Sequence, residues 1–225
     1  MNLFNDCDHL FKPQSLDDVV FADERTKRLV KAIVNRDMPF PVREGKCGIL
    51  LHGIPGTGKS ALAKLLPSAI EHSHGGEDAN ERYIGIQPGQ NGLRLLQQIA
   101  EQVKTVPFAH YHYVILDEVD NLSSDAMSVL KSVMNYGNTV WILTTNHFDK
   151  IEAGIKDRCY TMTFNAAPPE AWLPYVKRIL THASVIVENE EDLIKAIRPC
   201  NGSARKIAEQ AANIALGAHQ KEANL

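Results

Sequence analysis

The sequence predicts an α/β fold in which helices flank a parallel five-stranded sheet and a small helical domain follows. Five short apolar runs alternate with segments of helical periodicity, a pattern typical of parallel strands joined by right-handed crossovers. A glycine-rich turn joins the first run to the helix that follows it. Beyond a Pro-Pro pair at residues 168–169, only helical patterns remain. The 225 residues are enough for one such domain and a small second one.

The elements before and within the predicted sheet follow from periodicity. Residues 1–12 show no regular pattern, and helical spacing begins at residues 24–34, closed by Pro39 and Pro41. Each strand run is short and mostly apolar, as expected of strands covered on both faces. The strands are expected at residues 48–51, 83–86, 113–116, 140–143 and 160–164. Helices are expected between them at residues 59–71, 92–104 and 125–135, with an exposed loop at residues 72–81.

The Pro-Pro pair marks the expected domain boundary. Residues 1–166 are predicted to form the larger domain and residues 167–225 the small helical one. Its helices are expected at residues 171–183, 190–197 and 203–218. Pro174 is expected either to lie in the first turn of its helix, where proline is tolerated, or to kink that helix.

Composition excludes several classes of protein. The net charge of −3 rules out a polycation, so nucleic-acid binding would need a local patch or several assembled copies. Apolar runs are far shorter than the ~20 residues that cross a bilayer, and Asp6 and Asp8 stand where a basic leader would begin. We therefore expect a cytoplasmic protein that is neither secreted nor inserted in a membrane. Its four cysteines have no metal-ligand spacing and are expected to be reduced thiols.

A phosphate-binding loop is predicted at residues 53–60, whose sequence GIPGTGKS matches G-x-x-x-x-G-K-[ST]. It follows an apolar strand and opens a helix, the context that confirms the motif; the alternative is an ordinary glycine-rich turn. Lys59 would place its charge on the outer phosphates of ATP, and the Ser60 hydroxyl would bind Mg²⁺. The expected nucleotide contacts are Gly53, Pro55, Gly56, Thr57, Gly58, Lys59, Ser60 and Ala61.

Two carboxylates end the third strand run. In a parallel sheet that end faces the ligand crevice, so Asp117 is expected to hold Mg²⁺ and Glu118 to polarise the attacking water. The alternative is a solvated acidic turn, because Asp120 and Asn121 follow.

With these motifs in place, nearly the whole chain resembles the AAA+ ATPases, and within them the small subunits of sliding-clamp loaders. LDEVD at residues 116–120 resembles their LDEAD-type Walker B motif, and residues 125–131 resemble the helix after it. Residues 12–20 resemble their N-terminal signature, which implies that Val19 and Val20 lie near the adenine. Residues 144–146 (TTN) resemble sensor 1, which implies that Asn146 contacts water or phosphate.

The resemblance also assigns roles to two arginines. IKDRC at residues 155–159 resembles the family's S-R-C box, which implies that Arg158 is an arginine finger reaching the ATP of a neighbouring subunit. Asp157 replaces the serine of that box and can pair with Arg158 in the unassembled subunit. GSARK at residues 202–206 resembles the sensor 2 motif G-D-x-R-K, with Ser203 replacing its aspartate. Arg205 would then carry the nucleotide state to the helical lid.

The function implied is an ATP-hydrolysing AAA+ subunit that forms a homo- or hetero-oligomer through its ATPase faces and loads or remodels a protein on DNA. By this resemblance we expect the ATPase and lid domains of clamp-loader subunits, without their collar domain. Residues 87–94, with amides, glycines and a helix start, suit contact with DNA phosphates, although a plain capped helix explains them equally well. A helicase loader and a transposition regulator stay open, as do a non-hydrolysing nucleotide-switched module and a small-molecule kinase.

Overall fold

The central sheet has five parallel strands, as the sequence predicts. The computed structural model describes residues 8–42, 45–89, 92–187 and 189–223. The strands lie in the order β2-β3-β4-β1-β5, which brings the fourth strand of the chain next to the first and leaves the third strand on the far side of the fourth. They are β1 (Gly48–Gly53), β2 (Glu81–Gly85), β3 (His112–Asp117), β4 (Thr139–Thr145) and β5 (Cys159–Phe164). All four pairings are parallel, so every strand ends at the same edge of the sheet.

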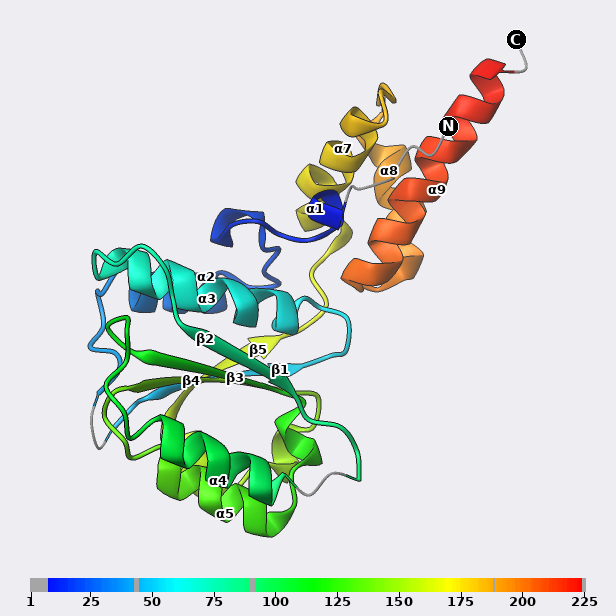
Figure 1. Ribbon diagram of the computed structural model, residues 1–225. Helices are drawn as coiled ribbons and strands as arrows, with labels where there is room; N and C mark the ends of the chain where they lie inside the picture. The colour runs from blue at the N-terminus through cyan, green and yellow to red at the C-terminus, as the bar shows by residue number, and fades with distance from the viewer. Residues whose placement is uncertain (1–7, 43–44, 90–91, 188, 224–225) are drawn as a thin grey trace.

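Helices cover both faces of the sheet (Figure 1). One face carries α2 (Glu24–Val34) and α3 (Lys59–Ser73), and the other carries α4 (Leu93–Gln102), α5 (Ser124–Val133) and α6 (Ala153–Asp157). Short 3-10 turns lie at η1 (Leu16–Asp18), η2 (Val119–Asn121) and η3 (Phe148–Lys150). The predicted fold class, with helices flanking a parallel sheet, is therefore confirmed.

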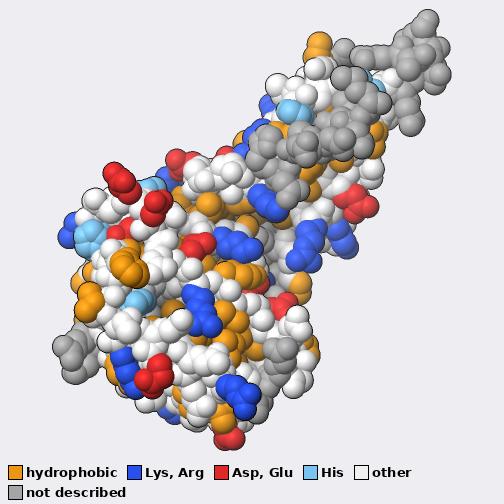
Figure 2. Space-filling view, in the orientation of Figure 1, with side chains coloured by type: hydrophobic (Ala, Val, Ile, Leu, Met, Phe, Trp, Pro, Cys, Tyr) orange, Lys and Arg blue, Asp and Glu red, His pale blue; other side chains and the backbone are white. Residues whose placement is uncertain are grey.

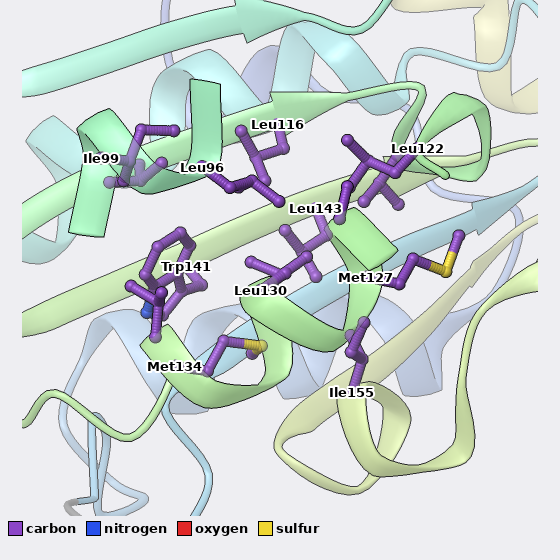
Figure 3. Packing of buried hydrophobic residues seen from close by; sticks show 14 of the residues in the cluster. Leu96, Ile99, Leu116, Leu122, Met127, Leu130, Met134, Trp141, Leu143 and Ile155 are labelled. Carbon is purple, nitrogen blue, oxygen red and sulfur yellow. The ribbon is translucent and has the colours of Figure 1, made fainter. Parts of the chain in front are cut away.

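The core between the sheet and α4 to α6 fixes the strands on which the candidate site is built. Figure 3 shows Leu96 and Leu130 from the helices meeting Leu116 of β3 and Trp141 of β4. All four side chains are fully buried. Burying a large apolar side chain contributes roughly 1.5–3 kcal/mol, so this layer holds the ends of β3 and β4 in fixed register.

The helical unit, residues 167–223, has its own core of fully buried side chains that include Val176, Ile179 and Ala211. Its elements are η4 (Pro169–Trp172), α7 (Leu173–His182), α8 (Glu190–Ile197), η5 (Arg198–Cys200) and α9 (Ala204–Ala223). Pro174 lies in the first turn of α7, one of the two expected arrangements. Among the helices of the described residues, none is both long enough and apolar enough to span a membrane.

The N-terminal segment, residues 8–22, packs against the helical unit, which the sequence pattern did not predict. A short helix, α1 (Asp8–Phe11), forms where no periodicity was found. The Tyr175 hydroxyl donates to the carbonyl oxygen of Phe11 at 3.1 Å, and Arg178 forms an ion pair with Asp18 at 2.6 Å. The segment thus connects the sheet to the helical unit, and the division at residues 166 and 167 stays a prediction.

Candidate active site

The glycine-rich loop of residues 53–58 joins β1 to α3 at the carboxyl edge of the sheet. Gly53 and Gly56 have φ angles of +133° and +81°, a region that disfavours any residue with a Cβ. A Cβ on Gly53 would lie 2.3 Å from the carbonyl oxygen of Phe164. These glycines let the chain turn tightly above β5 and leave backbone N–H groups for an anion at the N-terminus of α3.

Lys59 begins α3, and its side chain is almost fully buried beneath the loop. Its Nζ donates to the carbonyl oxygens of Gly53 at 3.0 Å and Ile54 at 2.7 Å. Burial lowers the pKa of Lys59 to about 8, against the opposing effect of nearby carboxylates, chiefly Asp117. Both of these acceptors are neutral, so a phosphate group at the loop would give this buried ammonium a directly bonded anionic partner.

Asp117, the last residue of β3, accepts hydrogen bonds from side chains of three neighbouring elements. Its Oδ1 accepts from the Ser60 hydroxyl at 2.8 Å and from the Thr144 hydroxyl of β4. Its Oδ2 accepts from the Tyr83 hydroxyl of β2. The adjacent carboxylate and hydroxyl oxygens of Asp117 and Ser60 are hard ligands of the kind that suit Mg²⁺. The residues present therefore fit the expected metal, which would neutralise and orient the outer phosphates when bound.

Glu118 lies directly after β3 in a strained backbone conformation, with φ +59° and ψ +48°. A residue with a Cβ in this left-handed region costs roughly 1–2 kcal/mol, so the surrounding bonds must hold it. Its backbone N–H donates to Thr144 Oγ1 at 3.1 Å, and its carboxylate accepts from Asn121 at 3.3 Å. The turn leaves the Glu118 side chain exposed, where it can meet a water molecule in front of the loop.

Asn146 lies one residue beyond β4, which pairs with β3, the strand that ends in Asp117. The sequence predicted this neighbourhood correctly. The preceding Thr145 donates to Asp120 at 2.6 Å and accepts from the backbone N–H of His147 at 2.9 Å. These bonds fix the turn that carries the half-buried Asn146. Thr144 and Tyr83 had no assigned role from sequence; only the strand order brings them to Asp117.

The helical unit contacts the glycine-rich loop at the start of α9. The backbone N–H of Ala204 donates to the carbonyl oxygen of Gly56 at 2.8 Å. A Cβ on Gly56 would lie 2.8 Å from Ser203 Oγ, so glycine is what permits this close approach. Arg205 lies in the first turn of α9 with an exposed side chain. It is one residue beyond the contact that joins loop and helical unit.

Val19 and Val20, the expected adenine contacts, line a pocket of about 430 Å³ between the chain at residues 17–27 and helix α7. Its apolar wall includes Phe21 and Pro174. The residues of the glycine-rich loop do not line this pocket.

Arg158 lies at the opposite edge of the sheet from the loop. It precedes Cys159, which pairs with Gly48 at the start of β1, whereas the loop follows the end of that strand. With six residues in β5, this separation is about 20 Å. Arg158 is thus too far from the glycine-rich loop of its own chain to contact a phosphate bound there.

The sequence left open a pairing of Arg158 with Asp157, and the described residues include no ion pair between the two. Instead, Arg158 Nε donates to Asn135 Oδ1 at 2.9 Å, and Nη1 donates to the carbonyl oxygen of Gly154 at 2.8 Å. Arg158 caps the C-terminus of α6, so its side chain folds back on a carbonyl of that helix while Asp157 stays exposed.

Comparison with known proteins gives one family and a set of relatives. The "ATPase family associated with various cellular activities (AAA)" matches residues 49–165. Replication factor C small subunit 2 of Pyrobaculum islandicum is 30% identical over 184 residues, covering 80% of this chain and 54% of the relative. Replication factor C small subunit of Thermofilum pendens is 28% identical over 226 residues, covering 92% of this chain and 66% of the relative. The chain thus spans between about half and two thirds of the length of these relatives.

Solved structures share the fold at low identity. The Thermotoga maritima RuvB Holliday junction branch migration motor has a TM-score of 0.67 at 16% identity, covering 90% of this chain and 64% of that one. The FIGL-1 AAA domain in complex with ADP also has a TM-score of 0.67, at 18% identity, covering 93% of this chain and 75% of that one.

Proposed function

This chain belongs to the AAA family of ATPases, and from that premise we propose that it binds ATP with Mg²⁺ at the glycine-rich loop and hydrolyses it to ADP and phosphate. The observation that carries the proposal is the 2.8 Å hydrogen bond between Ser60 and Asp117. It joins the hydroxyl after the loop lysine to the carboxylate at the end of β3, the two oxygen ligands that this chemistry needs side by side.

The hydrolytic roles divide among five side chains. Lys59 places its charge on the outer phosphates, and Ser60 with Asp117 would hold Mg²⁺. Glu118 accepts a proton from the attacking water, because its strained turn exposes the carboxylate beyond the end of the sheet. Asn146 orients that water or the outer phosphate from the neighbouring strand end.

Two further roles lie outside the hydrolytic step. Val19 and Val20 contact the adenine. Arg205 couples the outer phosphate to the helical unit through the α9 contact with Gly56.

The active assembly is an oligomer with ATP sites shared between subunits. Arg158 cannot reach the loop of its own chain across the sheet, yet it carries a full charge held by neutral partners. In the assembly it contacts the terminal phosphate of ATP bound to the adjacent subunit. A single subunit therefore binds ATP but hydrolyses it slowly.

The assembly acts on DNA, loading or remodelling a protein there in the manner of a clamp loader. Support comes from the names of the relatives, replication factor C small subunits, over 80% or more of this chain. Figure 2 shows Lys and Arg side chains interspersed with Asp and Glu on the visible face of both parts of the molecule, and the whole chain has net charge −3. Of residues 87–94, expected to contact DNA backbone, Gln90 and Asn91 lie outside the described residues. We place the protein in the cytoplasm, in line with its buried free thiols Cys47, Cys159 and Cys200.

A phosphate-release assay tests the proposal. Purified protein is incubated with ATP and Mg²⁺, with and without primed DNA, and with a chelator as control. Phosphate release that depends on Mg²⁺ and is lost in Lys59→Ala is expected. ATP binding without release under every condition would favour the non-hydrolysing module, and transfer of phosphate to a small acceptor would favour the kinase.

A further inference from the structure

The guanidinium of Arg158 is held by two acceptors that carry no charge. Asn135 Oδ1 accepts from Nε at 2.9 Å, and the carbonyl oxygen of Gly154 accepts from Nη1 at 2.8 Å. These bonds come from two different directions, the turn after α5 and the body of α6, so together they fix the plane of the group. Of its five N–H donors, the two bonds leave three for a further acceptor.

The side chain of Asn135 makes few contacts in the described part of the folded subunit. It lies in the exposed turn that leads from α5 to β4, where its backbone N–H donates to Ser132. The contact that its amide makes with the rest of the described chain is the bond to Arg158. An exposed amide whose bond orders an arginine side chain is better explained by what the arginine does than by the stability of the turn.

The neutrality of the acceptor matters for an arginine that must meet a phosphate. A carboxylate in this place would pair with the guanidinium and compete with the phosphate for the same charge. An amide oxygen orders the side chain and leaves its charge intact. Ordering in advance also reduces the rotamer entropy lost when the arginine meets its target.

We propose that Asn135 is a positioning residue for Arg158, holding its guanidinium in the orientation in which it contacts the ATP of an adjacent subunit. This rests on the proposed function, because Arg158 must act across an interface for its orientation to affect turnover. Asn135 does not touch the nucleotide itself. Its effect is on the catalytic rate in the neighbouring site, with no effect on ATP binding in its own.

The test mixes two kinds of subunit: a donor subunit, which supplies Arg158, and an acceptor subunit, which supplies the ATP site. The acceptor is full-length Arg158→Ala, which keeps an intact ATP site but lacks the arginine. Each donor carries Lys59→Ala, which removes its own ATP site, so turnover arises where a donor Arg158 completes an acceptor site. Four donor proteins are compared. One carries Lys59→Ala alone, and the others add Asn135→Ala, the isosteric Asn135→Asp or Asn138→Ala. Asn138 is an exposed asparagine in the same turn, so Asn138→Ala is the matched control. Thermal unfolding and mass photometry verify that all donors fold and assemble equally.

We expect the unchanged donor and the Asn138→Ala donor to stimulate the acceptor equally. The Asn135→Ala donor should lower kcat roughly tenfold at unchanged KM for ATP, because a misplaced group costs rate without changing binding. The Asn135→Asp donor should also lower kcat, since its carboxylate offsets the charge of Arg158. Equal kcat for the Asn135→Ala and Asn138→Ala donors would overturn this inference alone. Failure of the unchanged donor to stimulate the acceptor would overturn the shared-site proposal and this inference with it.

Discussion

The Ser60 hydroxyl donates a 2.8 Å hydrogen bond to Asp117 Oδ1, although the two residues are 57 positions apart in the chain. The bond exists because β3 lies near β1 in the sheet order, with β4 alone between them. It fixes the distance between the glycine-rich loop and the acidic strand end before any ligand binds. The ATP chemistry proposed for this chain depends on that distance.

Replacing Lys59 with alanine is expected to remove tight ATP binding and leave the fold intact. Lys59 begins α3 at the turn from β1, and its ammonium donates to two loop carbonyls. Losing hydrogen bonds from a charged group to phosphate costs about 1.5–3 kcal/mol, or roughly 10- to 100-fold in affinity. Calorimetric titration measures the affinity. Lys64→Ala, an exposed lysine of the same helix, is the control, and wild-type affinity in Lys59→Ala would disprove the loop assignment.

Glu118→Gln is expected to bind ATP normally and to lower its turnover by about 10²-fold or more, because the amide cannot accept the proton of the attacking water. Asp117 and Ser60 remain to hold Mg²⁺, so ATP affinity should change little. Steady-state phosphate release and nucleotide titration measure the two quantities. The control is Glu101→Gln, an exposed carboxylate on α4. Normal turnover in Glu118→Gln would mean that another group activates water.

Arg205→Ala is expected to abolish the difference between ATP and ADP in stabilising the protein. Arg205 follows the Ala204 contact with Gly56, so it can report the outer phosphate to the helical unit. Thermal unfolding with each nucleotide, in a Glu118→Gln background that preserves ATP, measures the difference. Lys206→Ala, the exposed neighbour, should behave like the background. A retained difference in Arg205→Ala would contradict the sensor role.

Glu71→Gln is expected to destabilise the fold by about 2 kcal/mol, because a buried carboxylate that accepts several hydrogen bonds is replaced by an amide that also donates. Glu71 accepts from the His110 backbone at 3.0 Å and the Tyr113 hydroxyl at 2.7 Å, and His110 Nδ1 lies 2.6 Å away. Burial alone would raise the pKa of Glu71, yet these bonds lower it below its ordinary value of 4.5.

The sign of the pH dependence follows from that lowered pKa. The stabilisation by Glu71 is fully present above pH 4.5 and is lost as the pH falls through the pKa of the folded state. The difference between wild type and Glu71→Gln in urea unfolding should therefore persist near neutral pH and shrink below pH 4.5. Glu77→Gln, an exposed carboxylate, is the control. A difference that grows on acidification would contradict this account.

Local pattern predicts the fold of this chain better than it predicts contacts between distant side chains. The strands and the glycine-rich loop follow from apolar runs and one short motif, because both are properties of neighbouring residues. The Tyr83 contact with Asp117 depends on which strands pair, which periodicity leaves open. The sequence left open a pairing of Arg158 with Asp157, its neighbour in the chain, whereas the Arg158 side chain bonds to Asn135 and Gly154. The packing of residues 8–22 on the helical unit is likewise set by tertiary contacts alone.

Mixing two inactive variants tests the shared ATP site most directly. Arg158→Ala has an intact ATP site without the arginine, and Lys59→Ala has the arginine without the site. A trans-acting arginine is worth about 10³-fold or more in rate, so Arg158→Ala alone should hydrolyse ATP slowly at every concentration. Lys59→Ala alone should also be slow, because it does not bind ATP tightly. The equimolar mixture should recover activity, and wild-type activity per subunit should rise with protein concentration. Wild-type turnover by Arg158→Ala, independent of protein concentration, would contradict the account and indicate an ATPase that works as a single subunit.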